Sequence, residues 1–234
     1  YGLIKEGDRV LVGFSGGKDS TTLIHALNRL KRVTPFDFDF KAVTVTYGMG
    51  EQVEFLAQHC KDHGIEHEII DTEIYELAGE KIRKNSSFCS FFSRMRRGYL
   101  YSTALEQGYN KLALGHHLDD AIESFFMNFL YNGALRSMPP NYKAENGLDV
   151  IRPLIFCRER QLRAFADTNE ILVIGDEACP AMRFDIKMPH AREKTKKLLA
   201  QMEEDNPQMF VSMKAAFKNI QSSTFFDQEL LDEV

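Results

Sequence analysis

The sequence has no apolar run that approaches the roughly 20 residues needed to cross a membrane. Charged residues interrupt its N-terminal segment, so we expect neither a membrane span nor an export signal. Cysteine is also sparse. The four cysteines, at positions 60, 89, 157 and 179, do not make a dense disulfide framework in a chain of 234 residues. These absences favour a reduced, cytoplasmic protein.

The chain also lacks an excess of positive charge. Its net charge is −5 and its pI is about 5.8, which argues against indiscriminate nucleic-acid binding but is compatible with a local basic face. We find no internal repeat and no low-complexity segment. The composition, 44% hydrophobic and 27% charged, is ordinary for a globular protein, and the length suits one domain with an appendage.

Strand-like and helix-like segments alternate over the first two-thirds of the chain. We expect strands at 9–14, 41–46, 66–70, 111–114, 150–155 and 172–175, and helices at 20–31, 51–63, 73–84, 88–107, 119–131 and 158–169. This order predicts an α/β fold, a parallel twisted sheet with helices on both faces. Further helices at 189–204 and 207–220 and an acidic tail suggest a main domain over 1–185 and a C-terminal helical extension over 186–234.

A short polar segment, Ser15-Gly16-Gly17-Lys18-Asp19-Ser20, joins the first expected strand to the first expected helix. Glycines let the backbone approach an anion, and the first N–H groups of a helix point at it. Lys18 adds a positive charge, and the two serines add hydroxyl donors. The spacing is not that of a Walker A loop, which has four residues between its glycines. The segment predicts a phosphate or nucleotide site; the alternative is a structural turn with a helix cap.

A second polar segment, Gly115-His116-His117-Leu118-Asp119-Asp120, closes another expected strand. Paired carboxylates at a strand end can hold Mg²⁺, which prefers carboxylates together with substrate phosphates. The alternative is that the two aspartates only stabilise the start of a helix. Ligands of such sheets bind beyond the carboxyl ends of the strands. Because both polar segments lie at such ends, we favour a joint anion and Mg²⁺ site.

Basic residues flank Cys89. Arg94, Arg96 and Arg97 follow it, and Lys81, Arg83 and Lys84 precede it. Arginines on one helical surface suit phosphate groups, so we interpret this cluster as a nucleic-acid contact; the alternative is a solvated basic face. The aromatic residues between the arginines are more typical of a core stripe.

Two histidines, His59 and His63, lie four residues apart on an expected helix, with Cys60 beside them and His67 beyond. This spacing suits a metal site. No further ligand follows at a recognisable spacing, however, which favours a solvated helix.

Several motifs together resemble the PP-loop ATP-pyrophosphatase superfamily, and within it the tRNA 2-thiocytidine synthetase (TtcA) family. The resemblance spans about residues 6–179, in order. It rests on the Ser15–Ser20 segment and on SFCSFFSRMRRG (87–98), ALGHHLDD (113–120), SMPP (137–140), IRPL (151–154) and CRE (157–159).

The resemblance implies an enzyme that uses ATP and Mg²⁺ to adenylate the 2-oxygen of an anticodon-loop cytidine in tRNA, after which sulfur from a donor displaces AMP. Family members can be homodimers. The implied ATP-binding residues are Ser15, Gly16, Gly17, Lys18, Asp19, Ser20, Val45, Thr46, Gly115 and His116. Asp19 with Asp119 or Asp120 would hold Mg²⁺, and Arg94, Arg96 and Arg97 would face phosphate or tRNA.

The family also binds a [4Fe–4S] cluster through cysteines, and here the sequence departs from the family pattern. Cys89 matches the first cysteine of a CxxC pair, Phe92 replaces the second, and Met182 stands where another is expected after Cys179. Phe cannot ligate iron, and Met is a poor substitute for a thiolate. The sequence therefore favours a protein without the cluster.

Three roles stay open for Cys89 and Cys179, which are also the candidate catalytic cysteines. They can hold a cluster together with another group, form a persulfide-carrying or disulfide-forming pair, or belong to a protein that uses ATP but has lost thiolation. Two other functions compete with thiolation: a PP-loop ligase that couples adenylation to a nitrogen nucleophile, and a binding protein for ATP or tRNA without catalysis.

Overall fold

The computed structural model describes residues 1–81, 88–174 and 190–226. Within them, one six-stranded sheet has the strand order β3-β2-β1-β4-β6-β5. All neighbouring strands are parallel except the edge strand β5, which is antiparallel to β6. The strands are β1 (Arg9–Gly13), β2 (Asp39–Val45), β3 (His67–Ile70), β4 (Lys111–Ala113), β5 (Asn141–Lys143) and β6 (Asp149–Ile151).

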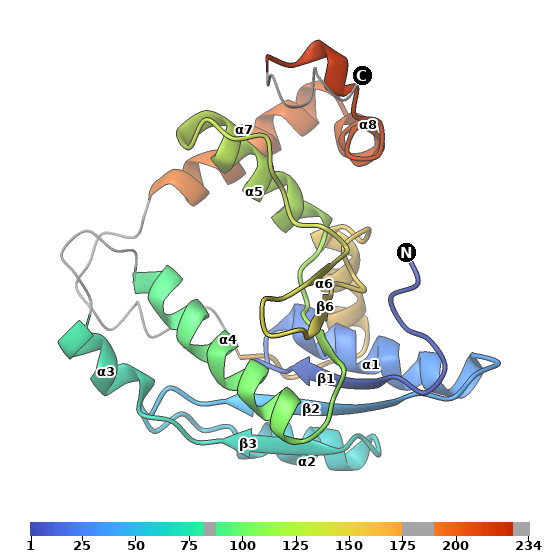
Figure 1. The fold of residues 1–234 in the computed structure, drawn as a ribbon, viewed down its shortest axis with the longest axis vertical. Helices are drawn as coiled ribbons and strands as arrows, with labels where there is room; N and C mark the ends of the chain where they lie inside the picture. The colour runs from blue at the N-terminus through green and yellow to red at the C-terminus, as the bar shows by residue number, and fades with distance from the viewer. Residues whose placement is uncertain (82–87, 175–189, 227–234) are drawn as a thin grey trace.

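Helices cover both faces of this sheet (Figure 1). One hydrophobic core joins the sheet to α1 (Lys18–Val33), α2 (Glu54–Asp62) and α6 (Glu159–Thr168); the other joins it to α3 (Ile74–Lys81) and α4 (Phe88–Glu106). Side chains alternate along a strand, so Val10 and Val12 enter the first core and Leu11 enters the second. Burial on both faces explains why the strands are continuous apolar runs.

The remaining helices form a third layer beyond the sheet. They are α5 (Leu118–Tyr131), α7 (His190–Asp205) and α8 (Met209–Ala216), followed by a short 3-10 helix at Ser222–Thr224. A separate small core holds them together, made by Leu118 and Ile122 of α5 with Leu199, Met209 and Phe210. Figure 1 shows α7 and α8 beside α5 at one end of the molecule. The expected boundary at 185/186 lies outside the described residues.

The predicted α/β fold class is confirmed, two local expectations are wrong, and one strand was missed. The strand expected at 150–155 ends at Ile151, because Pro153 has no N–H to continue the ladder. Residues 172–174 form no strand. The edge strand β5 was not expected, since it has three residues and directly follows Pro139 and Pro140. No helix of the described residues is long and apolar enough to span a membrane.

Candidate functional site

Both polar segments lie at the point where the sheet changes its direction of winding. β1 and β4 are neighbours in the sheet although β2 and β3 lie between them in sequence. The segments that follow β1 and β4 therefore meet at one edge. They touch closely: a Cβ added to Gly115 would lie 3.1 Å from the backbone nitrogen of Ser20 and 3.2 Å from the carbonyl carbon of Asp19. Any larger residue at position 115 would push the two backbone segments apart by a few tenths of an ångström.

Hydrogen bonds within the segment after β1 fix its conformation. Gly16 has φ +78°, the left-handed region that favours glycine, and a Cβ there would lie 2.7 Å from a methyl carbon of Ile174. The Ser20 hydroxyl lies 3.0 Å from the Gly17 carbonyl and donates to it, and it accepts from the Ser15 N–H at 3.2 Å. These contacts fix the loop and leave the start of α1 facing the edge of the sheet.

A pocket of about 180 Å³ opens between the two segments. Eight of the residues assigned from the sequence line it: Ser15, Asp19, Ser20, Val45, Gly115, His116, Asp120 and Arg96. The structure thus brings together residues from β2, α4 and both loops. Four other assigned residues, Gly16, Gly17, Lys18 and Thr46, are outside this lining. Thr46 is buried and its hydroxyl donates to Asp71 at 3.1 Å.

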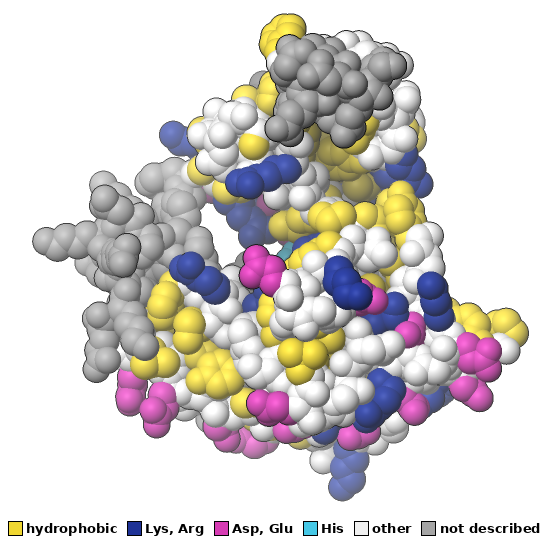
Figure 2. Space-filling model, in the orientation of Figure 1, with side chains coloured by type: hydrophobic (Ala, Val, Ile, Leu, Met, Phe, Trp, Pro, Cys, Tyr) yellow, Lys and Arg dark blue, Asp and Glu magenta, His cyan; other side chains and the backbone are white. Residues whose placement is uncertain are grey.

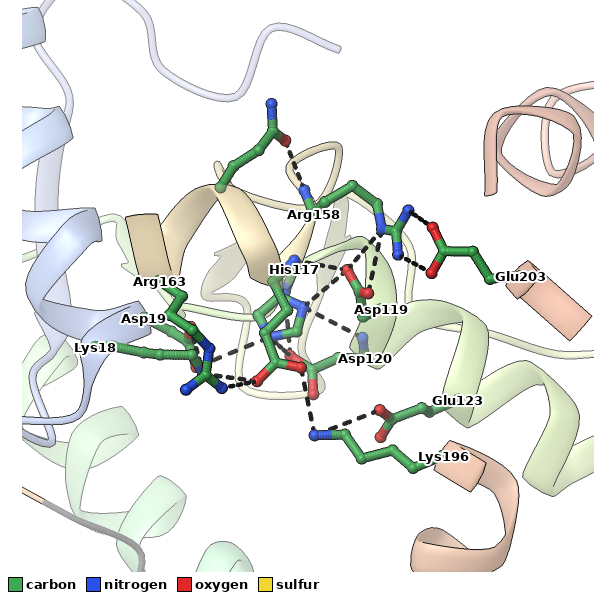
Figure 3. A network of polar contacts seen from close by, with 12 residues as sticks. Lys18, Asp19, His117, Asp119, Asp120, Glu123, Arg158, Arg163, Lys196 and Glu203 are labelled. Atoms are coloured by element: carbon green, nitrogen blue, oxygen red, sulfur yellow. Dashed lines mark hydrogen bonds and ion pairs between the residues drawn. The ribbon is translucent and has the colours of Figure 1, made fainter. Parts of the chain in front are cut away.

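Asp19 and Asp120 face this pocket and share one neighbour. The Nε2 atom of His117 lies 3.8 Å from an Asp19 carboxylate oxygen and 3.4 Å from one of Asp120 (Figure 3). The Oδ1 atom of Asp19 is buried and accepts no hydrogen bond from the described residues, although the Nζ atom of Lys18 lies 3.2 Å from it. Two carboxylates that line one pocket suit a hard divalent cation, so Asp19 and Asp120 fit Mg²⁺.

Asp119 does not fit the same role. Both of its carboxylate oxygens lie 3.2 Å from the Nε atom of Arg158, and one also accepts the backbone N–H of Glu159 at 2.7 Å. Asp119 therefore ties the start of α5 to the start of α6. Figure 3 shows it turned toward Arg158. The structure favours Asp120 over Asp119 as the partner of Asp19.

Lys18 forms an ion pair that the sequence did not reveal. Its Nζ atom lies 3.0 Å from the Glu159 carboxylate and 3.2 Å from Asp19. Burial acts to raise the pKa of Glu159, but the hydrogen bond and charge of Lys18, with help from Lys196, outweigh it and lower that pKa to about 2. Burial acts to lower the pKa of Lys18, but Asp19 and Glu159 raise it. Both groups are ionised at neutral pH.

The helix α7 adds charged residues to the site that sequence reasoning missed. Arg192 donates to Asp120 at 2.6 Å and to Glu123 at 2.9 Å. Glu203 accepts two hydrogen bonds from Arg158, at 2.7 and 2.8 Å. In a sequence, a helix rich in charged residues is typical of a solvent-exposed surface. The partners of Arg192 and Glu203 become evident only in the folded structure. Arg158 and Glu159 did belong to a motif of the resemblance, but nothing there assigned them a contact.

His116 lies in the pocket as a neutral group. Burial, and then the positive charges of Arg152, Arg97 and Arg192, lower its pKa to about 4, against the opposing effect of Asp120. Its Nδ1 atom is buried and has no hydrogen-bond partner within the described residues. A neutral ring with a free nitrogen can bind a ligand atom without adding charge to the site.

Comparison with known proteins now decides the family. Residues 3–188 match the model of a PP-loop domain. Curated proteins named tRNA-cytidine(32) 2-sulfurtransferase align over nearly the whole chain. The protein from Geobacter metallireducens is 41% identical over 98% of this chain and 89% of its own length; the one from Pseudomonas syringae pv. syringae is 38% identical over 99% and 84%. The chain belongs to the tRNA-cytidine(32) 2-sulfurtransferase family of PP-loop proteins.

A solved structure supports the fold. The U34-tRNA thiolase NcsA from Methanococcus maripaludis, determined with its [4Fe-4S] cluster, superposes with a TM-score of 0.73 at 22% identity. The match covers 95% of this chain and 76% of that one. The segment Ser15–Ser20 is called the PP-loop below.

A second hollow lies beside the PP-loop pocket, on the next face of α4. It has a volume of about 610 Å³ and is lined by Ser93, Arg94, Arg97, Gly98 and Tyr101. Arg96, between them in sequence, faces the PP-loop pocket instead and donates to the Tyr47 hydroxyl at 3.0 Å. Figure 2 shows the molecule hollowed near its centre, with Lys and Arg side chains on the rim. The three assigned arginines are thus divided between two adjoining surfaces.

The structure offers no second cysteine at the position of the family's CxxC pair. Phe92 is 3% exposed and packs against Tyr47 and Phe91, so it contributes to the core and offers no ligand. The backbone of Cys89 begins α4, and its side chain, Cys179 and Met182 lie outside what the structure describes. Cys60 is fully buried, and burial raises the pKa of its thiol to about 12.

Proposed function

We propose that this chain is an ATP-dependent tRNA sulfurtransferase that replaces the 2-oxygen of an anticodon-loop cytidine with sulfur. The observation that carries this proposal is the pocket itself. The PP-loop, the Gly115–Asp120 segment and Arg96 of α4 line one cavity, and the same helix presents Arg94 and Arg97 to the adjoining hollow. A nucleotide site and a surface for a polyanion are therefore neighbours. The name of the relatives, tRNA-cytidine(32) 2-sulfurtransferase, supports cytidine in tRNA as the substrate.

Adenylation is the first step of the proposed reaction. The N–H groups at the start of α1 would bind the phosphates of ATP, with Val45 and Gly115 beside the nucleoside. Lys18 lies outside the pocket lining and would have to exchange its contact with Glu159 or Asp19 for one with a phosphate. The cytidine O2 attacks the α-phosphorus, the bond to the bridging oxygen breaks, and pyrophosphate leaves. Neutral His116 can hydrogen-bond the resulting adenylate without placing a further charge beside it. A pyrimidine carbonyl oxygen leaves poorly, whereas AMP leaves readily.

Asp19 and Asp120 are the proposed Mg²⁺ ligands. When bound there, the ion offsets negative charge on the leaving pyrophosphate. Asp120 must then exchange its contact with Arg192 for one with the ion. Arg192 reaches the site from α7, so the C-terminal helices would respond to occupation of the pocket.

Sulfur transfer is the second step. A sulfur nucleophile, supplied by a donor, attacks C2 of the cytidine, and the C2–O bond breaks as AMP leaves. Cys89 and Cys179 are the proposed groups for handling this sulfur. Because Phe92 removes one family cysteine, we route no step through a cluster. A cytoplasmic homodimer is the proposed state of the protein, on family resemblance.

The nitrogen-nucleophile ligase is the alternative that an experiment must separate. Pyrophosphate release is measured with tRNA, Mg²⁺ and a sulfide source, for the wild type and for Cys89→Ser. For thiolation, release requires both tRNA and Mg²⁺, and Cys89→Ser adenylates tRNA but yields no thiolated nucleoside. If Cys89→Ser completes turnover at the wild-type rate, the ligase explains the site better. Release without tRNA would contradict both.

A further inference from the structure

Three histidines meet where α1 contacts α2, outside the nucleotide pocket. His25 comes from α1, and His59 and His63 lie one turn apart on α2 and at its end. One ring nitrogen of each lies within 4.8 Å of those of the other two. His25 and His59 are half-buried and His63 is exposed, so the cluster is anchored in the fold and open to solvent. His25 is seven residues beyond Lys18, about 10 Å along the helix.

Hydrogen bonds hold these histidine rings in the way that is usual for histidines bound to a metal. The Nδ1 atom of His63 lies 2.8 Å from the carbonyl oxygen of His59, so it carries the proton and donates. This leaves the Nε2 lone pair of His63 available, which is the arrangement that usually fixes the tautomer of a metal-bound histidine. The Nε2 atoms of His25 and His59 lie 2.9 Å apart and share one proton; that proton moves to the Nδ1 atom of its own ring when a metal binds both Nε2 atoms.

His25 is uncharged at neutral pH, and the charged form of His59 is disfavoured. Burial, and then the proximity of His63 and His59, lower the pKa of His25 to about 4. Burial and His63 also lower the pKa of His59, against the opposing charge of Asp62. Neutral imidazoles bind a cation without first releasing a proton to solvent. Two further neighbours are uncharged: the Phe165 ring packs on His25, and Asn28 donates to the His63 carbonyl.

We propose that His25, His59 and His63 form a binding site for a divalent transition metal, with Zn²⁺ as the expected ion. Tetrahedral Zn²⁺ with bonds of about 2.0–2.1 Å places its ligand nitrogens roughly 3.3 Å apart. The His25–His59 pair is a few tenths of an ångström from that spacing, and the ligand nitrogen of His63, which lies within 4.8 Å of the other two, has at most about 1.5 Å to close. Water completes the shell. Imidazole ligands select Zn²⁺ and its neighbours over Mg²⁺.

The nearby cysteine, Cys60, is not available as a thiolate ligand. Cys60 follows His59 in sequence but is fully buried in the opposite direction, among the core residues. Its thiol has a pKa of about 12. A metal on the three histidines would join α1, whose N-terminus carries the PP-loop, to α2. Because the three histidines meet only in the folded state, binding stabilises that state by RT ln(1 + [Zn²⁺]/Kd), which grows with the logarithm of the Zn²⁺ concentration.

The test is a titration of the untagged full-length protein with Zn²⁺ in excess Mg²⁺, which occupies carboxylates. We expect one site, and a melting temperature that rises with Zn²⁺. His25→Gln, His59→Gln and His63→Gln should each weaken Zn²⁺ binding by more than about 100-fold, since losing even an outer-shell partner costs 10–100-fold. His67→Gln is the matched control, because His67 bonds Thr44 and lies outside the cluster. Circular dichroism confirms that each variant is folded.

X-ray absorption of the Zn²⁺-loaded protein identifies the ligands. The proposal predicts a first shell of nitrogen and oxygen with the scattering pattern of three imidazoles. A sulfur shell would place the metal on cysteines and overturn the proposal. Absence of a stoichiometric site, or wild-type affinity in the three His→Gln variants, would overturn it equally. None of these readouts depends on tRNA thiolation.

Discussion

Gly115 lies directly against Ser20, so the loop after β4 packs on the first turn of α1. A Cβ on Gly115 would come within 3.1 Å of the Ser20 nitrogen and within 3.3 Å of the Asp19 carbonyl oxygen. All of the crowded atoms belong to the backbone, which yields less readily than a side chain. The two motifs of the site are thus held at a distance that one methyl group would change.

Gly115→Ala should therefore separate the PP-loop from the second motif by a few tenths of an ångström. We expect pyrophosphate release to fall roughly ten-fold, because a misplacement of about 1 Å costs around 100-fold. Gly98→Ala is the control: its Cβ meets nothing within 4 Å, and alanine in place of a helical glycine stabilises by about 0.5–1 kcal/mol. Because Gly98 lines the hollow proposed for tRNA, the two variants are compared at saturating tRNA. Equal activity in both variants would show that the close approach has no role in catalysis.

Substitution of the three aspartates should have two different effects, one on Mg²⁺-dependent activity and one on the stability of the fold. Asp19→Asn and Asp120→Asn are expected to lower Mg²⁺-dependent pyrophosphate release by on the order of 100-fold or more, as for other groups that stabilise developing charge. Asp119→Asn should instead destabilise the fold by on the order of 1–3 kcal/mol through its bond to Arg158. Urea unfolding and Mg²⁺ titration of activity measure the two effects. If Asp119→Asn loses more of the Mg²⁺-dependent activity than the other two variants, the assignment of Asp120 rather than Asp119 as the Mg²⁺ ligand is reversed.

The arginines of α4 should affect tRNA rather than ATP. Arg94→Gln and Arg97→Gln remove charges that line the 610 Å³ hollow. Each should weaken tRNA binding and reduce the slope of log affinity against log salt by about one unit, while ATP affinity is unchanged. Arg32→Gln, at the exposed end of α1, is the control. An unchanged salt slope in both α4 variants would place tRNA elsewhere.

Acidification should weaken the fold before the carboxylates titrate. The pKa values of His25 and His116 are lowered to about 4, and those of His59 and His67 are lowered as well. The unfolded chain, with histidine pKa values of about 6.5, binds more protons in this window, so stability falls as the pH drops below 6.5. Urea midpoints in chelator should fall from pH 6.5 to 5, and less so in His25→Gln. A flat profile would contradict these shifts.

Sequence predicted the parts of the site that are local. The PP-loop and the Gly115–Asp120 segment are continuous motifs, and the alternation of strands and helices places both at one edge of the sheet. The partners of those motifs were not predictable, because packing brings them together. Glu159 reaches Lys18 across 141 residues, and Arg192 reaches Asp120 across 72.

The histidine cluster shows the same limit. The spacing of His59 and His63 indicated a metal site, but the third ring comes from His25, 34 residues earlier than His59 and on another helix. No sequence spacing predicts that contact, and a solvated helix was the favoured interpretation for that reason. The edge strand β5 was missed on different grounds, since three residues are too few to show an alternating pattern.

The most direct test of thiolation is mass spectrometry of the nucleosides from unmodified tRNA incubated with this protein, ATP, Mg²⁺ and sodium sulfide under reducing conditions. The account predicts that 2-thiocytidine appears, with one AMP and one pyrophosphate for each thiolated nucleoside, and that omission of ATP abolishes it. AMP and pyrophosphate produced without any 2-thiocytidine would contradict the account.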